Sequence, residues 1–366
     1  MKSRFVLFVV VASTFLGPSV LVAQHDKDVQ VGAIRWDAWT GDLGPGAAVE
    51  KSLGPAKWHY RLPFFAKVIG PDKVLIDGTS QEVMDEEIDY AARAGLDYWA
   101  FVLYEADDSM SIGISRYLSS AKRSKIKFDL ITETGDWSRP EMVSRMESLL
   151  TEKGYVTVLG GRPVIYILTN SKQISDSCGG NDLCFKAGVE KFRADLANRG
   201  LKTPYIVIMD FDAADGKKLL DRVHADALSS YTTRGNAPDG SSFAANATGQ
   251  QWFWNQCKAT GAQVVPIVSL GAGRAPRIEN PVPWEKWQKQ GVGNLADNPP
   301  TPKQITELFN SALSWLKHNR DSAKAQLIIT YAWNENDEGG WLVPTLSEGT
   351  ARIDAASAAL KTKSDK

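Results

Sequence analysis

The sequence predicts a single α/β domain, a (β/α)8 TIM barrel with long loops after its strands, and three observations predict it. Short, continuous apolar segments recur along the chain, as buried parallel strands do, and amphipathic helical patterns separate them. Eight such strand–helix units follow one another, and this alternation is typical of parallel βαβ structure. The length of 366 residues fits one barrel with insertions.

The eight expected strands are rich in branched apolar and aromatic residues. They cover residues 29–36, 98–104, 127–133, 164–168, 205–211, 227–231, 264–270 and 327–333. The expected helices follow at 84–95, 113–123, 140–153, 183–200, 216–223, 245–261, 302–320 and 348–361. Gly95 suits a helix C-cap, and Pro140 and Pro302 suit a first helical turn. An open doubly wound sheet is the alternative, but no GxGxxG or P-loop motif opens any helix.

The N-terminus is expected to be a signal peptide at residues 1–23, followed by one barrel domain at 28–362. Lys2 and Arg4 precede an apolar run at 5–16, and Ala23 is a plausible cleavage site. We therefore expect a secreted or periplasmic protein that has no membrane association once the leader is removed. A net charge of −1 without a basic tract argues against a nucleic-acid partner, and a monomer is expected.

Three cysteines are present, and two of them suit a disulfide. Cys178 and Cys184 lie six residues apart in a polar, Gly-rich segment, and an oxidising compartment would allow them to pair. Cys257 lies in a helical pattern, where a buried free thiol is the default. No HExxH motif or histidine cluster is present, so no metal and no cofactor are expected.

The segment that follows the last strand is the most informative for function. Glu335 and Glu338 come just after the expected strand at 327–333, and Gly339 and Gly340 allow a sharp turn beside them. Paired carboxylates beside aromatic rings are what a glycosidase requires: one protonates the leaving oxygen and the other stabilises or activates. The alternative is a solvated acidic loop that follows a buried strand.

Other acidic and aromatic residues recur at the ends of the expected strands. In a barrel these ends share one mouth, where active sites of this fold lie. The candidates for substrate binding are Arg35, Trp36, Asp37, Tyr104, Glu133, Asp210, Tyr231, Trp333, Asn334 and Trp341. Of these, Trp36, Trp333 and Trp341 are expected to stack on sugar rings, although a buried supporting role is the alternative for a tryptophan. Arg35 or Arg274 would keep one of the two acids ionised.

Three segments resemble those of the WbsX-like, glycoside hydrolase family 99-like barrels. The sequence YAWNENDEGGWLVP at 331–344 resembles their W-N-E-x-x-E-G…L-x-P signature and is similar to the E-x-x-E-G motif of the family 99 endo-α-mannosidases. GRPVIY at 161–166 and GLDYWAF at 95–101 resemble two of their strands. These segments lie in the same order as in the family and span most of residues 29–345.

The resemblance implies a barrel that cleaves glycosidic bonds with Glu335 and Glu338. It implies that Glu338 is the general acid/base and that Glu335 assists the sugar 2-hydroxyl, with retention through an anhydro-sugar intermediate. The expected function is thus a secreted retaining glycoside hydrolase acting on a glycan or polysaccharide, with endo action on α-mannoside-like linkages as one form. The alternatives are a glycan-binding barrel without catalysis and a glycosyltransferase-like protein of polysaccharide assembly.

Overall fold

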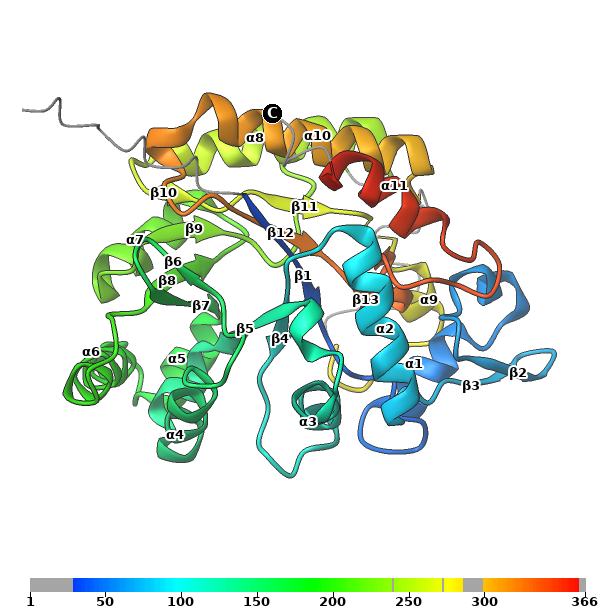
Figure 1. The fold of residues 1–366 in the computed structure, drawn as a ribbon, viewed down its shortest axis with the longest axis horizontal. Coiled ribbons are helices and arrows are strands. Elements are labelled where there is room, and N and C mark those ends of the chain that lie inside the picture. The colour runs from blue at the N-terminus through cyan, green and yellow to red at the C-terminus, as the bar shows by residue number, and fades with distance from the viewer. Residues whose placement is uncertain (1–28, 239, 272, 286–298, 362–366) are drawn as a thin grey trace, which may run out of the picture.

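The computed structural model of the chain describes residues 29–238, 240–271, 273–285 and 299–361, and its centre is a closed barrel of parallel strands (Figure 1). The strands follow one another around the barrel in chain order. They are β1 (Gln30–Arg35), β4 (Tyr98–Val102), β5 (Lys127–Glu133), β7 (Arg162–Leu168), β8 (Tyr205–Met209), β9 (Ala227–Ser229), β10 (Gln263–Val264) with β11 (Ile267–Ser269), and β12 (Leu327–Tyr331). Because β12 pairs in parallel with β1, the sheet closes, and the predicted barrel is confirmed over the alternative of an open sheet.

The seventh barrel position is one strand that bends at Pro266. Its first part, β10, pairs with β9, and its second part, β11, pairs with β12. Between them Val265 donates its backbone N–H to Leu228 at 2.9 Å, and the carbonyl of Pro266 accepts from Ile329 at 3.1 Å. Proline has no N–H to give to a ladder, which accounts for the break at this residue.

Helices form a layer around the barrel (Figure 1). They are α2 (Gln81–Ala94), α3 (Ile112–Ser119), α4 (Pro140–Leu149), α6 (Leu183–Asn198), α7 (Ala213–Val223), α8 (Phe243–Ala259), α10 (Pro302–His318) and α11 (Ala351–Leu360). Gly95 ends α2 in the left-handed conformation, with φ of 84°, as a C-cap glycine does. Thr301 and Gln304 form a capping box at the start of α10, with Pro302 in its first turn. The expected helices are therefore present, with ends that differ by a few residues.

The interior of the barrel is filled by large side chains that need small neighbours. The Tyr98 and Tyr166 hydroxyls lie 2.9 Å apart, and that of Tyr98 also donates to the carbonyl of Ile328. A Cβ on Gly32 would lie 2.1 Å from Cε2 of Tyr98, so only glycine leaves room for this ring.

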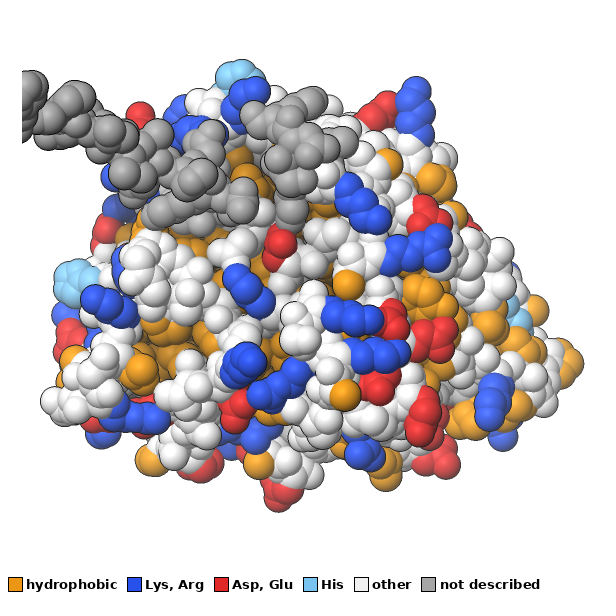
Figure 2. Space-filling model, viewed as in Figure 1, with side chains coloured by type: hydrophobic (Ala, Val, Ile, Leu, Met, Phe, Trp, Pro, Cys, Tyr) orange, Lys and Arg blue, Asp and Glu red, His pale blue; other side chains and the backbone are white. Residues whose placement is uncertain are grey.

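The long loops carry short elements that periodicity does not predict. They are α1 (Gly46–Leu53), the hairpin of β2 (Lys67–Gly70) and β3 (Lys73–Leu75), β6 (Thr157–Val158), α5 (Ser171–Ser177) and α9 (Ala275–Glu279). The β2–β3 hairpin projects from the side of the barrel (Figure 1). On the face that Figure 2 shows, basic and acidic side chains are interspersed. Within the described ranges, no helix is long and apolar enough to cross a membrane.

The structure joins Cys178 and Cys184, which lie just after α5 and at the start of α6. Their Cα atoms are 5.3 Å apart, and Cys257 is a buried free thiol in α8. Titration of thiols on the exported, non-reduced protein under denaturing conditions is therefore expected to find one thiol, and two more after reduction. Three thiols before reduction would contradict the bridge.

Candidate active site at the mouth of the barrel

The two candidate acids lie on a short hairpin that follows β12. Strand β13 (Asn334–Glu335) pairs in antiparallel register with β14 (Gly340–Trp341), and the tight turn at 336–338, which ends with Glu338, joins them. Gly339 completes this turn with φ of 89°, a conformation that residues with a Cβ rarely adopt. The turn therefore keeps both carboxylates at the same end of the barrel.

Close backbone contact brings the loop after β11 against this hairpin. A Cβ on Gly271 would lie 2.1 Å from the Gly339 carbonyl oxygen, and one on Gly339 would lie 2.5 Å from the Gly273 nitrogen. Because these positions are glycines, the two loops can approach closely. Because of this contact, Arg274 and Arg277, which follow β11, lie close to the two acids of the hairpin.

Glu335 is buried in surroundings that favour its protonated form. Its Oε1 accepts a hydrogen bond from the Tyr231 hydroxyl at 2.8 Å, and its Oε2 lies 3.7 Å from Nη2 of Arg277. Burial raises the pKa of Glu335 well above its usual range, and the charge of Glu338 raises it further, against a lowering by Arg277. These surroundings therefore make Glu335 harder to ionise than Glu338.

Glu338 is also buried but lies among cations. Its Oε1 forms ion pairs with Nη2 of Arg274 at 2.7 Å and with Nη1 of Arg277, and its Oε2 accepts from the Tyr331 hydroxyl at 2.7 Å. Burial alone would raise the pKa of Glu338, but the two arginines outweigh this effect and bring it down to about 2. Glu338 is therefore ionised at neutral pH. This order of ionisation is opposite to the one expected from the sequence.

Arg277, on α9, is the common partner of the acids. Its Nε lies 2.7 Å from Oδ2 of the fully buried Asp337, and its Nη1 lies 2.6 Å from Glu285. The guanidinium carbon lies 5.1 Å from the ring centre of Trp36. Only 1% of the Arg277 side chain is exposed. Its guanidinium is held by ion pairs with buried carboxylates and by packing on the ring of Trp36.

Both acids line a pocket of about 920 Å³ with aromatic walls. Trp36 packs edge to face on Trp284, with ring centres 5.9 Å apart, and its Nε1 donates to the Tyr104 hydroxyl at 2.8 Å. Trp284 is 42% exposed, which is unusual for so large an apolar side chain. Apolar rings with a polar edge, next to carboxylates, suit the faces and hydroxyls of sugars.

Four of the predicted substrate-binding residues line this pocket with the acids. They are Trp36, Tyr104, Glu133 and Tyr231, which follow or end four different barrel strands. Tyr231 contacts Glu335 directly, whereas Glu133 accepts a hydrogen bond from Gln173 of α5. The structure thus brings these side chains together at the carboxyl ends of the strands, as the barrel geometry requires.

Two of the predicted sugar platforms are wrong, because both rings are fully buried. Trp333 donates from Nε1 to Glu87 at 2.8 Å and packs on Trp99 in the interior. Trp341 lies under the guanidinium of Arg352, which is 3.6 Å from its ring centre. Neither ring lines the pocket that contains the two acids.

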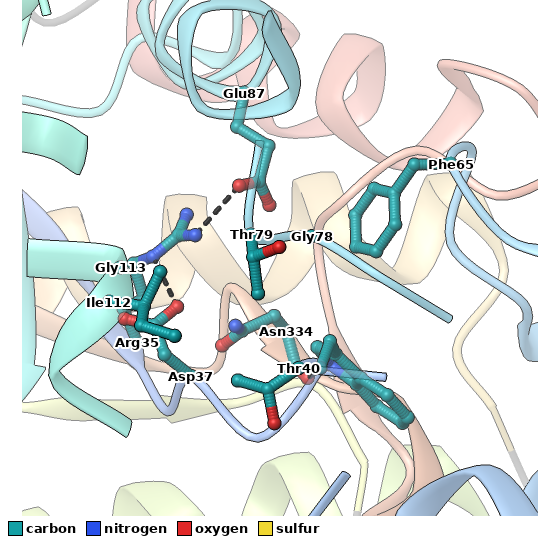
Figure 3. Close-up of a pocket in the computed structure, with 11 residues that line it drawn as sticks. Arg35, Asp37, Thr40, Phe65, Gly78, Thr79, Glu87, Ile112, Gly113 and Asn334 are labelled. Carbon is teal, nitrogen blue, oxygen red and sulfur yellow. Dashed lines mark hydrogen bonds and ion pairs between the residues drawn. The ribbon is translucent and has the colours of Figure 1, made fainter. Parts of the chain in front are cut away.

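Arg35, Asp37 and Asn334 also lie outside that pocket, which corrects their expected role. They line a separate cavity of about 20 Å³, which has room for a water molecule but not for a sugar (Figure 3). Arg35 forms ion pairs with Asp37 and with Glu87 of α2, both at 2.7 Å. Burial raises the pKa of Asp37 to about 6 although Arg35 lowers it. The group supports the hairpin: the Asn334 Oδ1 accepts from the backbone of Trp36 at 2.9 Å.

Asp210, after β8, lies in a different hollow of about 690 Å³ beside α5 and α7. Its Oδ2 accepts from the Thr169 hydroxyl at 2.7 Å, and its Oδ1 accepts from the backbone of Asp212. Asp210 is therefore occupied in joining two loops, and its assignment to the substrate site of Glu335 and Glu338 is corrected.

Four residues of the site were not among those expected from the sequence. They are Arg277, Trp284, Glu285 and Tyr331. The first three lie within 271–301, which is a long loop after the seventh expected strand. The glycines at 271 and 273 were the available signal that this loop approaches another backbone. Among the described residues, no group of His, Cys, Asp and Glu side chains has the arrangement of a metal site.

Comparisons with known proteins agree with the fold. No protein-family model matches the chain, and no curated protein matches its sequence. A structure of the glycoside hydrolase family 99 endo-α-mannosidase from Bacteroides thetaiotaomicron is similar to the chain with a TM-score of 0.54 at 13% identity, and it covers 92% of this chain and 99% of that one. A second structure, with bis-tris-propane, gives a TM-score of 0.53 at 13% identity, covering 92% and 97%. The family that the motifs resemble thus shares the barrel of this chain.

Proposed function

We propose that the protein is an exported glycoside hydrolase that uses Glu335 and Glu338 to cleave a glycan or polysaccharide. The observation that carries this proposal is that two buried carboxyls line one aromatic pocket, Glu335 bonded to a tyrosine hydroxyl and Glu338 to two arginines. Acid–base cleavage of a glycosidic bond needs one carboxyl with a proton and one without. The leader expected at residues 1–23 supports export and lies outside the described residues.

The surroundings of the two acids assign their roles. Glu335, whose pKa is raised by burial, donates a proton to the leaving oxygen. Glu338 stays ionised beside Arg274 and Arg277, and it stabilises or activates at the anomeric centre. We propose retention of configuration on the basis of the family resemblance. The resemblance implies Glu338 as the general acid, whereas we propose Glu335 for that role.

The substrate class follows from the pocket and from the fold comparison. A pocket of about 920 Å³ with neighbouring tryptophans has room for more than one sugar ring, which favours cleavage within a chain. The proteins with the same fold include an endo-α-mannosidase, so α-mannoside-like linkages are the first to test.

Digestion of a glycan library tests the proposal. The wild-type protein is expected to release new reducing ends from at least one glycan, and the Glu335→Gln/Glu338→Gln double variant is expected to release none. Glu307→Gln is the matched control, because Glu307 is an exposed residue of α10. If the double variant matched the wild type, the pair would not be catalytic. Binding of glycans without cleavage would favour the alternative of a non-catalytic barrel.

Removal of an aromatic wall of the pocket should weaken substrate binding. Trp36→Ala is expected to raise KM by about 10-fold with a smaller change in kcat, because ring stacking contributes on the order of 1 kcal/mol. Trp252→Ala is the control, since Trp252 is 43% exposed on α8 and does not line the pocket. Steady-state kinetics measures both, and equal effects of the two substitutions would contradict a platform role.

The two pKa shifts predict the pH dependence of kcat/KM. Glu335 must be protonated, so activity falls as the pH rises through its raised folded-state pKa. Glu338 must be ionised, so the acid limb lies towards its pKa of about 2. We therefore expect a plateau that begins in the acidic range and ends in one ionisation at a pH above the usual pKa of a glutamate. With an activated aryl glycoside, Glu335→Gln should remove that alkaline limb, and an unchanged limb would contradict the assignment.

A further inference from the structure

Glu285 is a further carboxylate in the same pocket, and the mechanism above does not use it. It follows Trp284 on the loop after α9, and it lines the pocket together with Glu335 and Glu338. Only 8% of the residue is exposed, so its surroundings rather than bulk water determine which groups it can bond.

The two oxygens of Glu285 differ in their partners. Oε1 accepts hydrogen bonds from Nη1 of Arg277 at 2.6 Å and from Nη2 of Arg274 at 2.9 Å. Oε2 is buried, and within the described part of the chain no group donates to it. A buried acceptor without a donor costs free energy, so native structures rarely leave one unless a ligand or water completes it.

The charges around Glu285 indicate which donor fits Oε2. Arg274 and Arg277 both lie against this carboxylate, and a cation bound at Oε2 would face their positive charges. An anion would face Glu285 and the ionised Glu338 instead. A neutral hydroxyl donates a hydrogen bond without adding charge, and hydroxyls are the abundant donors of a glycan.

We propose that Glu285 is a specificity-determining residue that accepts a hydrogen bond through Oε2 from one hydroxyl of the sugar bound beside Glu335 and Glu338. This inference rests on the proposed function for the identity of the ligand as a sugar. A site built to accept from a hydroxyl discriminates strongly against the analogue that lacks it, because the buried acceptor is then left unpaired.

The test combines one substitution with sugars that each lack one hydroxyl. Glu285→Gln keeps an oxygen for the two arginines and places an NH₂ group where Oε2 was, so it turns the free acceptor into a donor. Glu279→Gln is the matched control, because Glu279 ends α9 and pairs with Lys57 outside the pocket. The probes are the methylumbelliferyl α-mannoside, α-glucoside, α-galactoside and α-fucoside, and the monodeoxy analogues of the one that is cleaved fastest.

The expected result is a coupling between Glu285 and one hydroxyl. In the wild type, kcat/KM should fall about 10- to 100-fold for one monodeoxy analogue. Glu285→Gln should lose a similar factor on the parent glycoside and little more on that analogue, while Glu279→Gln behaves as the wild type. An equal loss on the parent and on all analogues would overturn the inference and leave the proposed hydrolase intact.

Binding measurements separate this inference from the proposed function. Titration of the corresponding methyl glycosides, followed by tryptophan fluorescence, reports binding even where nothing is cleaved. If Glu285→Gln and the loss of one hydroxyl had coupled effects on the Kd but no glycoside were cleaved, the role of Glu285 would be supported and the hydrolase contradicted. Absence of binding with all of these sugars would contradict the role of Glu285, and the digestion of the glycan library decides separately on the hydrolase.

Discussion

Glu335→Gln is expected to reduce cleavage of a natural glycan by ~10²–10⁴-fold while retaining more activity on an aryl or fluoride glycoside. The natural leaving group needs a proton, and Glu335 is the buried carboxyl whose pKa is raised. A good leaving group departs without protonation, so the substitution matters less there. Glu338→Gln should reduce cleavage of both substrates, because the carboxylate held by Arg274 and Arg277 acts on the sugar itself.

Parallel kinetics of both variants on both substrates give the measurement. Each glutamine variant keeps the shape of the side chain, and circular dichroism checks that the fold is unchanged. If Glu338→Gln were the variant rescued by the activated substrate, the roles implied by the family resemblance would hold and our assignment would be reversed. Equal loss on both substrates by Glu335→Gln would exclude it as the acid.

Arg277→Leu is expected to lower the free energy of unfolding by ~3–5 kcal/mol at neutral pH. Removal of this buried guanidinium leaves the carboxylates of Asp337 and Glu338 in the interior without their shared cation. Urea denaturation measures the change. Arg93→Leu is the control, because the ion pair of Arg93 with Asp354 is half exposed on both sides and contributes ~0–1 kcal/mol.

The destabilisation by Arg277→Leu should depend on pH in a defined direction. The folded-state pKa of Glu338 lies at about 2, below the usual value of a glutamate. Its ionised form therefore contributes stability above the unfolded-state pKa, and this contribution is lost as the pH falls through the folded-state pKa. The difference between the wild type and the variant should narrow as the pH falls from 5 towards 2. A difference that stays constant over this range would contradict the ion-pair account.

The barrel could be predicted because its pattern is local and repeated. Each strand is a short apolar run between amphipathic helices, and eight repeats leave few arrangements. The β2–β3 hairpin, α1 and α9 could not be predicted in this way, because they are short and packed by contacts with distant loops. The break at Pro266 is readable from the sequence, since proline cannot complete the ladder.

The candidate site could be predicted in position but not in detail. The motif at 331–344 located Glu335 and Glu338, and strand ends supplied Trp36, Tyr104, Glu133 and Tyr231. Sequence position alone does not tell whether a side chain after a strand turns into the pocket or behind it. Trp333 is an example. It lies two residues from Glu335, yet its ring turns away from the pocket and donates a hydrogen bond to Glu87.

The order of ionisation depends on contacts between residues far apart in the sequence. Arg277 lies about 60 residues before the acids, and glycine contacts between two loops bring it to them. The sequence spacing of Glu335 and Glu338 shows that each affects the other, but not which of them is nearer to the arginines. In the folded chain Arg274 and Arg277 both pair with Glu338, and this contact lowers the pKa of Glu338.

The most direct test of the central claim is the structure of the Glu335→Gln variant with an oligosaccharide that the wild-type protein cleaves. Our account predicts a sugar ring against Trp36 in the pocket, with its glycosidic oxygen within hydrogen-bonding distance of side chain 335 and its anomeric carbon facing Glu338. An oligosaccharide bound instead in the hollow beside Asp210, away from both acids, would contradict it.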